Sequence, residues 1–272
     1  MSTLNLASLL TACVRASEGA GHIIREIGKE KDTLDVKDKT TSETVVVGLG
    51  PGQRAVQSVD PQTKADRLSQ LHIISSLKTL WPSLTVIGEE DDHNPDAEKD
   101  QLASYGLASL APEAAPVTDD AVPVALRNPQ LKDLVVWVDP MDGTREFTLG
   151  FFQDVTVLIG ISHKGEALAG LIHEPFAPVS PGGTTTWGVV GGDVYFRAPP
   201  VNPPPGRKVF VSSRSRPDET LEKMLEKLHP IEILRLGGAG NKILSVIMGT
   251  SDAYVYLPPV SCSLTLGCCL PG

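Results

Sequence analysis

Two aspartates, Asp139 and Asp142, stand three positions apart at the end of an apolar run, where the chain reads Trp-Val-Asp-Pro-Met-Asp-Gly-Thr. A turn at Pro140 and Met141 would bring both carboxylates, and the backbone carbonyl of Met141, to the same point. Carboxylate and carbonyl oxygens are the ligands that Mg²⁺ prefers. Thr144 follows with a hydroxyl that can hold a water molecule. The alternative is a plain turn capped by an aspartate.

Two further acidic segments could complete such a site. Glu89 lies in a Gly-Glu-Glu sequence at the end of a short apolar run, and Asp66 closes the sequence Asp-Pro-Gln-Thr-Lys-Ala-Asp. Taken alone, the first is typical of an acidic surface turn. The second is typical of a helix start, with Thr63 as the cap or Asp66 exposed in the first turn. Neither segment indicates a metal site by itself.

Glycine-rich turns are the other candidates for binding an anion. The sequence Gly-Gly-Ala-Gly at 237–240 precedes an expected helix, where backbone N–H groups can approach a phosphate; a simple strand-to-helix turn is the alternative. The Gly-Leu-Gly-Pro-Gly sequence within 45–57 has no following Lys-Ser or Lys-Thr pair. It therefore predicts a flexible loop rather than a phosphate-binding loop.

These residues must be positioned by a mixture of helices and strands. The first half predicts an amphipathic helix at 6–27, capped by Ser2 or Thr3, and a second helix at 63–80 that Pro82 stops. A short buried strand is expected at 84–87 and a long surface excursion with one short helix at 91–129. Strands are then expected at 134–138, 155–162, 167–173 and 187–196.

The second half continues the alternation after a proline-rich linker at 198–205. Strands are expected at 208–213, 232–236 and 252–257, and helices at 219–228 and 239–248. No internal repeat is present. Helices and strands mixed in this way predict an α/β or α+β class with layered sheets.

The composition narrows the function classes. The chain has 272 residues, enough for one large domain or two joined lobes, and a formal net charge of −9. A net acidic protein is a poor candidate for nucleic-acid binding, and an anionic substrate would need a cation or a local basic pocket. No window is typical of a membrane span or a signal peptide. The four cysteines lack paired spacing, which favours reduced thiols and a cytoplasmic protein.

Taken together, the acidic motifs resemble one family. Asp66 in Thr-x-Ala-Asp, Glu89 in Gly-Glu-Glu and the Asp-Pro-x-Asp-Gly-Thr block occur in the order and spacing of the inositol monophosphatase-like superfamily of magnesium-dependent, lithium-sensitive phosphatases. Within it, 148–161, 169–175, 186–189 and 235–242 are similar to the 3'(2'),5'-bisphosphate nucleotidase branch. The resemblance covers nearly the whole chain up to about Leu257.

The resemblance implies a layered α-β-α-β-α sandwich of the inositol monophosphatase and fructose-1,6-bisphosphatase type. It implies an N-terminal α+β lobe at 1–200 that carries the metal site, and an α/β lobe at 201–272. The implied site residues fall into three sets: Glu89, Asp139, Met141 and Asp142 hold Mg²⁺; Asp66 and Thr144 position the attacking water; Gly143, Ser213, Arg216, Gly238 and Lys242 contact the substrate.

Two departures from the family pattern stand out. Arg216 occupies a position where the nucleotidase branch has histidine. The family also follows the strand at 252–257 with a Trp-Asp segment whose aspartate completes the metal site, and here no acidic residue follows Asp252. The resemblance therefore implies an incomplete C-terminal lobe, with 45–59 as an insertion.

The activity implied is removal of the 3'-phosphate from 3'-phosphoadenosine 5'-phosphate by a cytoplasmic, monomeric, Mg²⁺-dependent enzyme. Inositol phosphates are the alternative substrates, because the same metal core serves both. A non-catalytic variant is the alternative from another class, because of the missing Trp-Asp segment. The turn at 237–242 favours the nucleotide.

Overall fold

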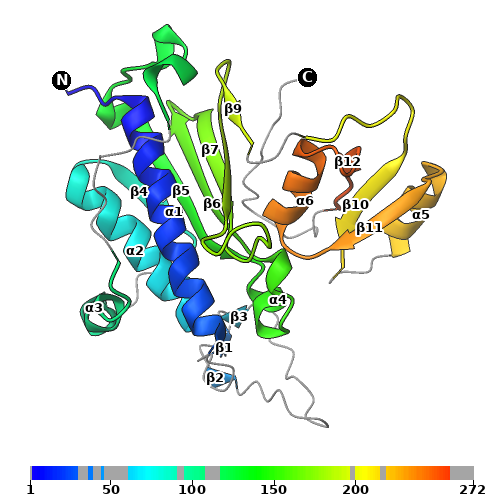
Figure 1. The fold of residues 1–272 in the computed structure, drawn as a ribbon, viewed down its shortest axis with the longest axis horizontal. Coiled ribbons are helices and arrows are strands. Elements are labelled where there is room, and N and C mark those ends of the chain that lie inside the picture. Colours follow the sequence, from blue (N-terminus) through cyan, green and yellow to red (C-terminus); the bar gives the residue numbers. More distant parts are fainter. Residues whose placement is uncertain are drawn as a thin grey trace. The chain divides into compact units, whose positions relative to one another are not determined.

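The computed structural model describes residues 2–29, 36–38, 44–45, 61–90, 95–107, 117–196, 200–214 and 219–257 (Figure 1). The chain divides into two compact units, residues 1–197 and 198–272. The expected loop at 45–57, Arg216 and the chain beyond Leu257 lie outside the described residues. In the part that is described, no helix is long and apolar enough to cross a membrane.

Helix α1 (Leu6–Lys29) is a central element of the first unit and confirms the expected amphipathic helix. It is buried along most of its length because it packs on both α2 and the large sheet. The expected cap is wrong: Ser2 and Thr3 contact the strand-like segment near Gln130. The Asn5 side chain instead accepts a 2.8 Å hydrogen bond from the backbone N–H of Ser8, which satisfies an amide of the first turn.

Helix α2 (Lys64–Leu80) begins and ends as expected. Thr63 is its N-cap, with a hydroxyl that accepts from the N–H of Ala65, and the chain leaves the helix just before Pro82. Its buried face includes Leu68, Ile73 and Leu77. The short helix expected in the surface excursion is α3 (Pro95–Ala103), and three brief 3₁₀ turns follow between 119 and 133.

A six-stranded sheet forms the centre of the first unit, in the order β4-β5-β6-β7-β8-β9. Only β4 and β5 are parallel, and the other neighbours run antiparallel. Its strands are β4 (Thr85–Gly88), β5 (Leu134–Asp142), β6 (Thr156–His163), β7 (Glu166–Glu174), β8 (Thr184–Val189) and β9 (Val194–Tyr195). Three very short strands, β1 (Val36–Asp38), β2 (Thr44–Val45) and β3 (Pro61–Gln62), form a separate small sheet in the order β2-β1-β3.

Two details of the sheet bear on the sequence predictions. The strands expected at 155–162 and 167–173 are confirmed as β6 and β7, which form a hairpin with Lys164 and Gly165 in the left-handed region at its tip. The strand expected at 84–87 exists but is not buried: β4 is an edge strand, and Thr85 and Ile87 are exposed. In this sheet β4 pairs with β5 alone, so its apolar composition did not predict burial.

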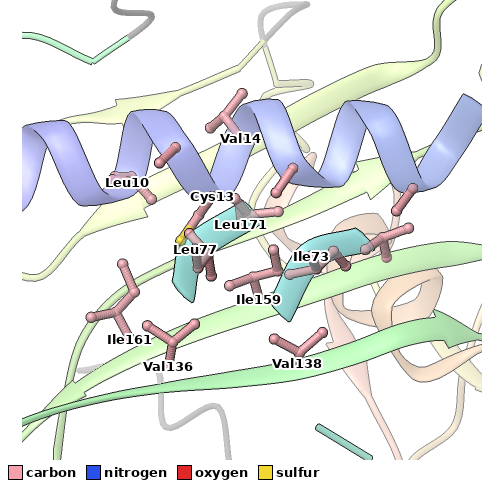
Figure 2. Packing of buried hydrophobic residues seen from close by; sticks show 14 of the residues in the cluster. Leu10, Cys13, Val14, Ile73, Leu77, Val136, Val138, Ile159, Ile161 and Leu171 are labelled. Atoms are coloured by element: carbon pink, nitrogen blue, oxygen red, sulfur yellow. The ribbon is translucent and has the colours of Figure 1, made fainter. Parts of the chain in front are cut away.

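The core of the first unit is a single layer between α1 and the sheet. Figure 2 shows Leu10, Cys13 and Val14 of α1 above residues of β5, β6 and β7, with Ile73 and Leu77 of α2 beside them. Alternate residues of β5, namely Leu134, Val136 and Val138, face this core. The opposite face of β5 therefore carries Val135, Trp137 and Asp139.

The second unit is a small parallel sheet with two helices. Its strands are β10 (Val209–Ser213), β11 (Glu232–Leu236) and β12 (Ala253–Tyr254), in the order β11-β10-β12. The helices are α5 (Glu219–Lys227) and α6 (Ala239–Ile247). The Asp252 carboxylate accepts from Arg207 at 3.2 Å and from the N–H of Val209 at 2.7 Å, which fixes the start of β12 against β10.

Candidate active site

A β-bulge in β5 places Asp139 and Asp142 on the same face of the sheet. Opposite β6, Asp139 pairs with Leu158 and Asp142 with Thr156, so β5 has one residue more than its partner between these pairs. Residues three apart on a regular strand point to opposite faces, and the extra residue cancels that difference. The expected turn after the strand is therefore wrong in form: Pro140 and Met141 are a bulge within the strand.

Local hydrogen bonds hold this bulge. The Asp139 Oδ1 atom accepts from the N–H of Met141 at 3.2 Å, and Asp142 Oδ2 accepts from the Thr156 hydroxyl at 2.9 Å. The Asp139 carboxylate thus caps a backbone N–H, as in the aspartate-capped alternative, but it does so within the bulge and not at a turn. The Met141 side chain is fully buried and anchors the bulge in the core.

A glycine then turns the chain into the helix that carries Thr144. Gly143 has a φ of 91°, and a Cβ atom there would lie 3.0 Å from the carbonyl oxygen of Asp154. Any other residue would therefore be strained by both the backbone and the contact. Helix α4 (Thr144–Thr148) follows, and the Thr144 hydroxyl lies 3.0 Å from the Met141 carbonyl.

Asp66 reaches the same place from α2. Its Oδ2 atom accepts from the backbone N–H of Thr63 at 2.7 Å and from the Thr63 hydroxyl at 2.6 Å, which completes a capping box. Its Oδ1 atom lies 2.9 Å from the Thr144 hydroxyl. Asp66 is fully buried, so the alternative of an exposed aspartate in the first turn is wrong. Its carboxylate contacts both the N-cap residue Thr63 and Thr144.

The Gly-Glu-Glu sequence brings two more carboxylates to this end of the sheet. The backbone N–H of Glu89 donates to the carbonyl of Val138 at 2.9 Å, one residue before Asp139. Glu89 is exposed, whereas Glu90 is buried beside α2. The side-chain amide of Gln62 donates to Glu90 Oε2.

The pKa values of two of these carboxylates, Asp139 and Asp66, are raised. Burial, with the negative charges of Glu89 and Asp142 beside it, raises the pKa of Asp139 well above its usual range, and a side-chain hydrogen bond with Glu89 adds to the rise. Burial, and then the charge of Glu90, raises the pKa of Asp66 to about 7 although Thr63 and Thr144 donate to it. Carboxylates gathered at this spacing require protons or a cation.

Comparison with known proteins agrees with this geometry. The sequence model of the inositol monophosphatase family matches residues 5–263. The chain belongs to this family. It is 35% identical to 3'(2'),5'-bisphosphate nucleotidase 1 of Homo sapiens over 93% of this chain and 76% of that protein. It is 33% identical to the Dictyostelium discoideum protein of the same name, over 93% of this chain and 78% of that protein.

Solved structures of the inositol monophosphatase family show the same fold. CysQ from Bacteroides thetaiotaomicron, described as a bacterial member of this family, has a TM-score of 0.56 at 18% identity and covers 92% of this chain and 79% of that chain. The suhB protein of Bartonella henselae has a TM-score of 0.60 at 18% identity, with 90% and 77% covered. The expected α/β fold class is therefore confirmed.

The family comprises Mg²⁺-dependent phosphomonoesterases, and the donors in this chain fit that ion. Among the described residues, no three aspartate, glutamate, histidine or cysteine side chains already converge as a ligand group. The carboxylates of Glu89, Asp139 and Asp142 and the Met141 carbonyl nevertheless supply only oxygen donors, as Mg²⁺ prefers. Burial and the negative charges of Glu89 and Asp142 raise the pKa of Asp139, and a cation bound there would offset this repulsion.

A second group of predicted residues meets in the second unit. Ser213 ends β10 opposite Leu236 of β11, and Gly238 follows β11 as the N-cap of α6. Lys242 lies in the first turns of α6, only 4% exposed. Its ammonium donates to the Gly238 carbonyl and lies 5.5 Å from the centre of the Tyr254 ring. These residues share one edge of the small parallel sheet.

Three residues of the first unit escaped the sequence analysis: Gln70, Gln62 and Thr156. Thr156 could have been found only from the strand register, which sets it opposite Asp142. Gln70 had a visible signal, because it stands four residues after Asp66 and so lies on the same face of α2. A polar residue at that position, on a helix face that is otherwise buried, indicates a specific partner.

Proposed function

We propose that this inositol monophosphatase family member removes the 3'-phosphate from 3'-phosphoadenosine 5'-phosphate, giving AMP and phosphate. The contact that carries the phosphatase assignment is the hydrogen bond between Thr144 and the buried Asp66, next to the carboxylates of β5. The choice of a nucleotide is supported by the identity to bisphosphate nucleotidases over 93% of the chain.

Glu89, Asp139, the Met141 carbonyl and Asp142 are the residues that would hold Mg²⁺. When bound, the ion neutralises charge on the phosphoryl oxygens and lowers the pKa of a coordinated water. The chain's own contribution is to keep these donors on one face: the bulge aligns the aspartates, and Thr156 orients Asp142 by its hydrogen bond.

Thr144 and Asp66 together accept the proton of the attacking water: the Thr144 hydroxyl relays it and the Asp66 carboxylate takes it up. The Thr144 hydroxyl is shared between Asp66 Oδ1 at 2.9 Å and the Met141 carbonyl at 3.0 Å, so its orientation is fixed. With its pKa raised to about 7, Asp66 is basic enough to take a proton through Thr144 and acidic enough to release it near neutral pH. The two Thr63 hydrogen bonds keep its other oxygen occupied.

The proposed substrate contacts are given for each unit by itself. Gly143 presents backbone beside the carboxylates, and Ser213, Gly238, Lys242 and Arg216 are assigned to the nucleotide. The buried Lys242 ammonium is a positive group in a net acidic chain, which suits a phosphate. Arg216 in place of histidine would add a second cation to that group.

The test is phosphate release measured in parallel from 3'-phosphoadenosine 5'-phosphate and from inositol phosphates, with Mg²⁺ titrated in each assay. We expect kcat/KM to favour the nucleotide, with no turnover after chelation of Mg²⁺. A clear preference for inositol phosphates would overturn the substrate, and turnover of neither would overturn the activity. Because the resemblance implies lithium sensitivity, LiCl should inhibit more strongly than KCl at matched ionic strength.

A further inference from the structure

We propose that Gln70 is a positioning residue for the metal site: its side-chain amide fixes the Glu89–Glu90 turn from α2, and so fixes the direction of Glu89. This inference rests on the proposed function for its choice of Mg²⁺. It concerns ion binding rather than the identity of the substrate.

The contact is a two-point hydrogen bond between one side chain and one residue's backbone. The Gln70 amide nitrogen donates to the carbonyl of Glu90 at 2.8 Å, and its amide oxygen accepts from the N–H of Glu90 at 2.9 Å. Both residues are buried. The glutamine amide thus occupies the place that a neighbouring strand would take, just where β4 ends.

Gly88 leaves the space for this amide. A Cβ atom at Gly88 would overlap the amide atoms of Gln70, so a side chain there would displace the glutamine. The φ angle of Gly88 is not in the left-handed region, so alanine is compatible with the backbone itself. The glycine is therefore needed for the approach of Gln70 and not for its conformational freedom.

Glu89 is held between two anchors as a result. Its own N–H donates to Val138 of β5, and the next residue is held on both backbone groups by Gln70. These backbone anchors fix where the exposed Glu89 side chain leaves the chain, and so limit the positions that its carboxylate can reach. Outer contacts that orient metal ligands typically change ion affinity or activity by about 10-fold to 100-fold when removed.

The experiment compares Gln70→Ala, Gly88→Ala and the double variant with the parent protein. Mg²⁺ affinity is measured by calorimetry and by the rise in melting temperature on adding Mg²⁺, both without substrate. We expect each single variant to bind Mg²⁺ about 10-fold to 100-fold more weakly. Since Gly88→Ala acts only by displacing Gln70, the double variant should bind no more weakly than Gln70→Ala alone.

Ser69→Ala is the matched control. Ser69 is buried on the same helix and its hydroxyl bonds to the Ala20 carbonyl of α1, away from the turn. This variant should lower the melting temperature slightly and leave Mg²⁺ affinity unchanged. If Gln70→Ala does not fold, Gly88→Ala, which keeps every polar side chain, still provides the affinity measurement.

Other results would overturn the inference. Unchanged Mg²⁺ affinity in a folded Gln70→Ala or Gly88→Ala variant would make the contact a purely structural one, and additive losses in the double variant would show that Gly88 acts independently. A parent protein that binds no Mg²⁺ would also overturn it. Failure to release phosphate from the nucleotide would overturn the proposed function alone, because ion binding is measured without substrate.

Discussion

The two units bring their candidate residues together in opposite ways. In the first, five acidic residues from α2, β5 and the turn after β4 lie around a bulge in a mostly antiparallel sheet. In the second, a serine, a glycine and a buried lysine share the edge of a small parallel sheet. One group is an excess of negative charge, and the other includes a cation already paired with a carbonyl and an aromatic ring.

This difference suggests a division of labour. Burial and neighbouring negative charges raise the pKa values of Asp139 and Asp66, and a bound cation would offset this repulsion. Lys242, in contrast, donates to the Gly238 carbonyl and lies over the Tyr254 ring, so its positive charge is buried in the second unit. Changes in the first unit should therefore reduce kcat, and changes in the second should raise KM.

The largest effect is expected from Asp139→Asn. Removing one charged donor should forfeit several kcal/mol of transition-state stabilisation, which is roughly a thousandfold in kcat at 1.36 kcal/mol per factor of ten. The amide keeps an oxygen for the N–H of Met141, so the bulge should survive. Without Mg²⁺ the melting temperature should stay the same or rise, because repulsion with Glu89 and Asp142 is reduced.

Steady-state kinetics at saturating substrate, together with melting curves in chelator, measure both effects. Equal kcat in variant and parent would reject Asp139 as a ligand. A large fall in the metal-free melting temperature would instead assign Asp139 a structural role in β5.

A smaller loss is expected from Thr144→Val, which replaces the hydroxyl by a methyl group of similar size. Loss of a proton-transfer group costs about 10²-fold in rate at the lower end of its usual range, and that is the loss we expect here. Thr144→Ser is the control, because it keeps the hydroxyl between Asp66 and Met141. If valine and serine variants turned over equally fast, the proton would have to leave by another route.

The site in the first unit was largely predictable because its signals are local. Asp139, Asp142 and Thr144 lie within six residues, and the capping pattern of Thr63 with Asp66 marks the start of a helix. The bulge at Pro140 and Met141 was not predictable, because it depends on the register between β5 and β6. The spacing of Gln70 from Asp66 indicates a shared helix face, but its partner, the turn after β4, is set by helix packing and was not predictable.

The second unit was predictable as elements but not as a site. Alternating strands and helices indicated β10, α5, β11 and α6 with bounds close to those observed. Nothing in residue type or spacing joins Ser213 to Lys242, and only the resemblance grouped them. The parallel register sets Ser213 opposite Leu236, at the end of the strand that leads to Gly238 and α6.

The effect of Lys242→Met should be more modest and of a different kind. Removing a charged hydrogen-bonding group worth about 1.5–3 kcal/mol should raise KM for the nucleotide by roughly 10-fold or more. We expect kcat to change little. Lys223→Met is the control, because Lys223 is an exposed lysine whose described partner is Glu219 at 2.6 Å. A kcat loss as large as that of Thr144→Val would contradict the division between the units.

The smallest expected effect distinguishes the units by their stability in acid. In the first unit, burial lowers the pKa of His173 to about 3 and that of His72 to about 4, with Arg25 adding to the shift of His173. His173 is held on β7 by Thr185 at 2.9 Å and lies against Gly21 of α1. The histidine in the described part of the second unit, His229, is exposed.

The direction in which stability changes with pH follows from proton binding. Between the folded pKa near 3 and the unfolded value near 6.5, the unfolded chain binds more protons at His173, so stability falls as the pH drops below about 6.5. At pH 5 the loss should be about 1–2 kcal/mol relative to pH 7.5. His173→Asn keeps a polar group near Thr185 and should lose less stability on that pH change, although it starts lower because of the cavity.

Urea unfolding at both pH values measures the difference, with His229→Asn as the control. If both variants and the parent lost equal stability between pH 7.5 and pH 5, His173 would not be the acid-sensitive contact between α1 and the sheet.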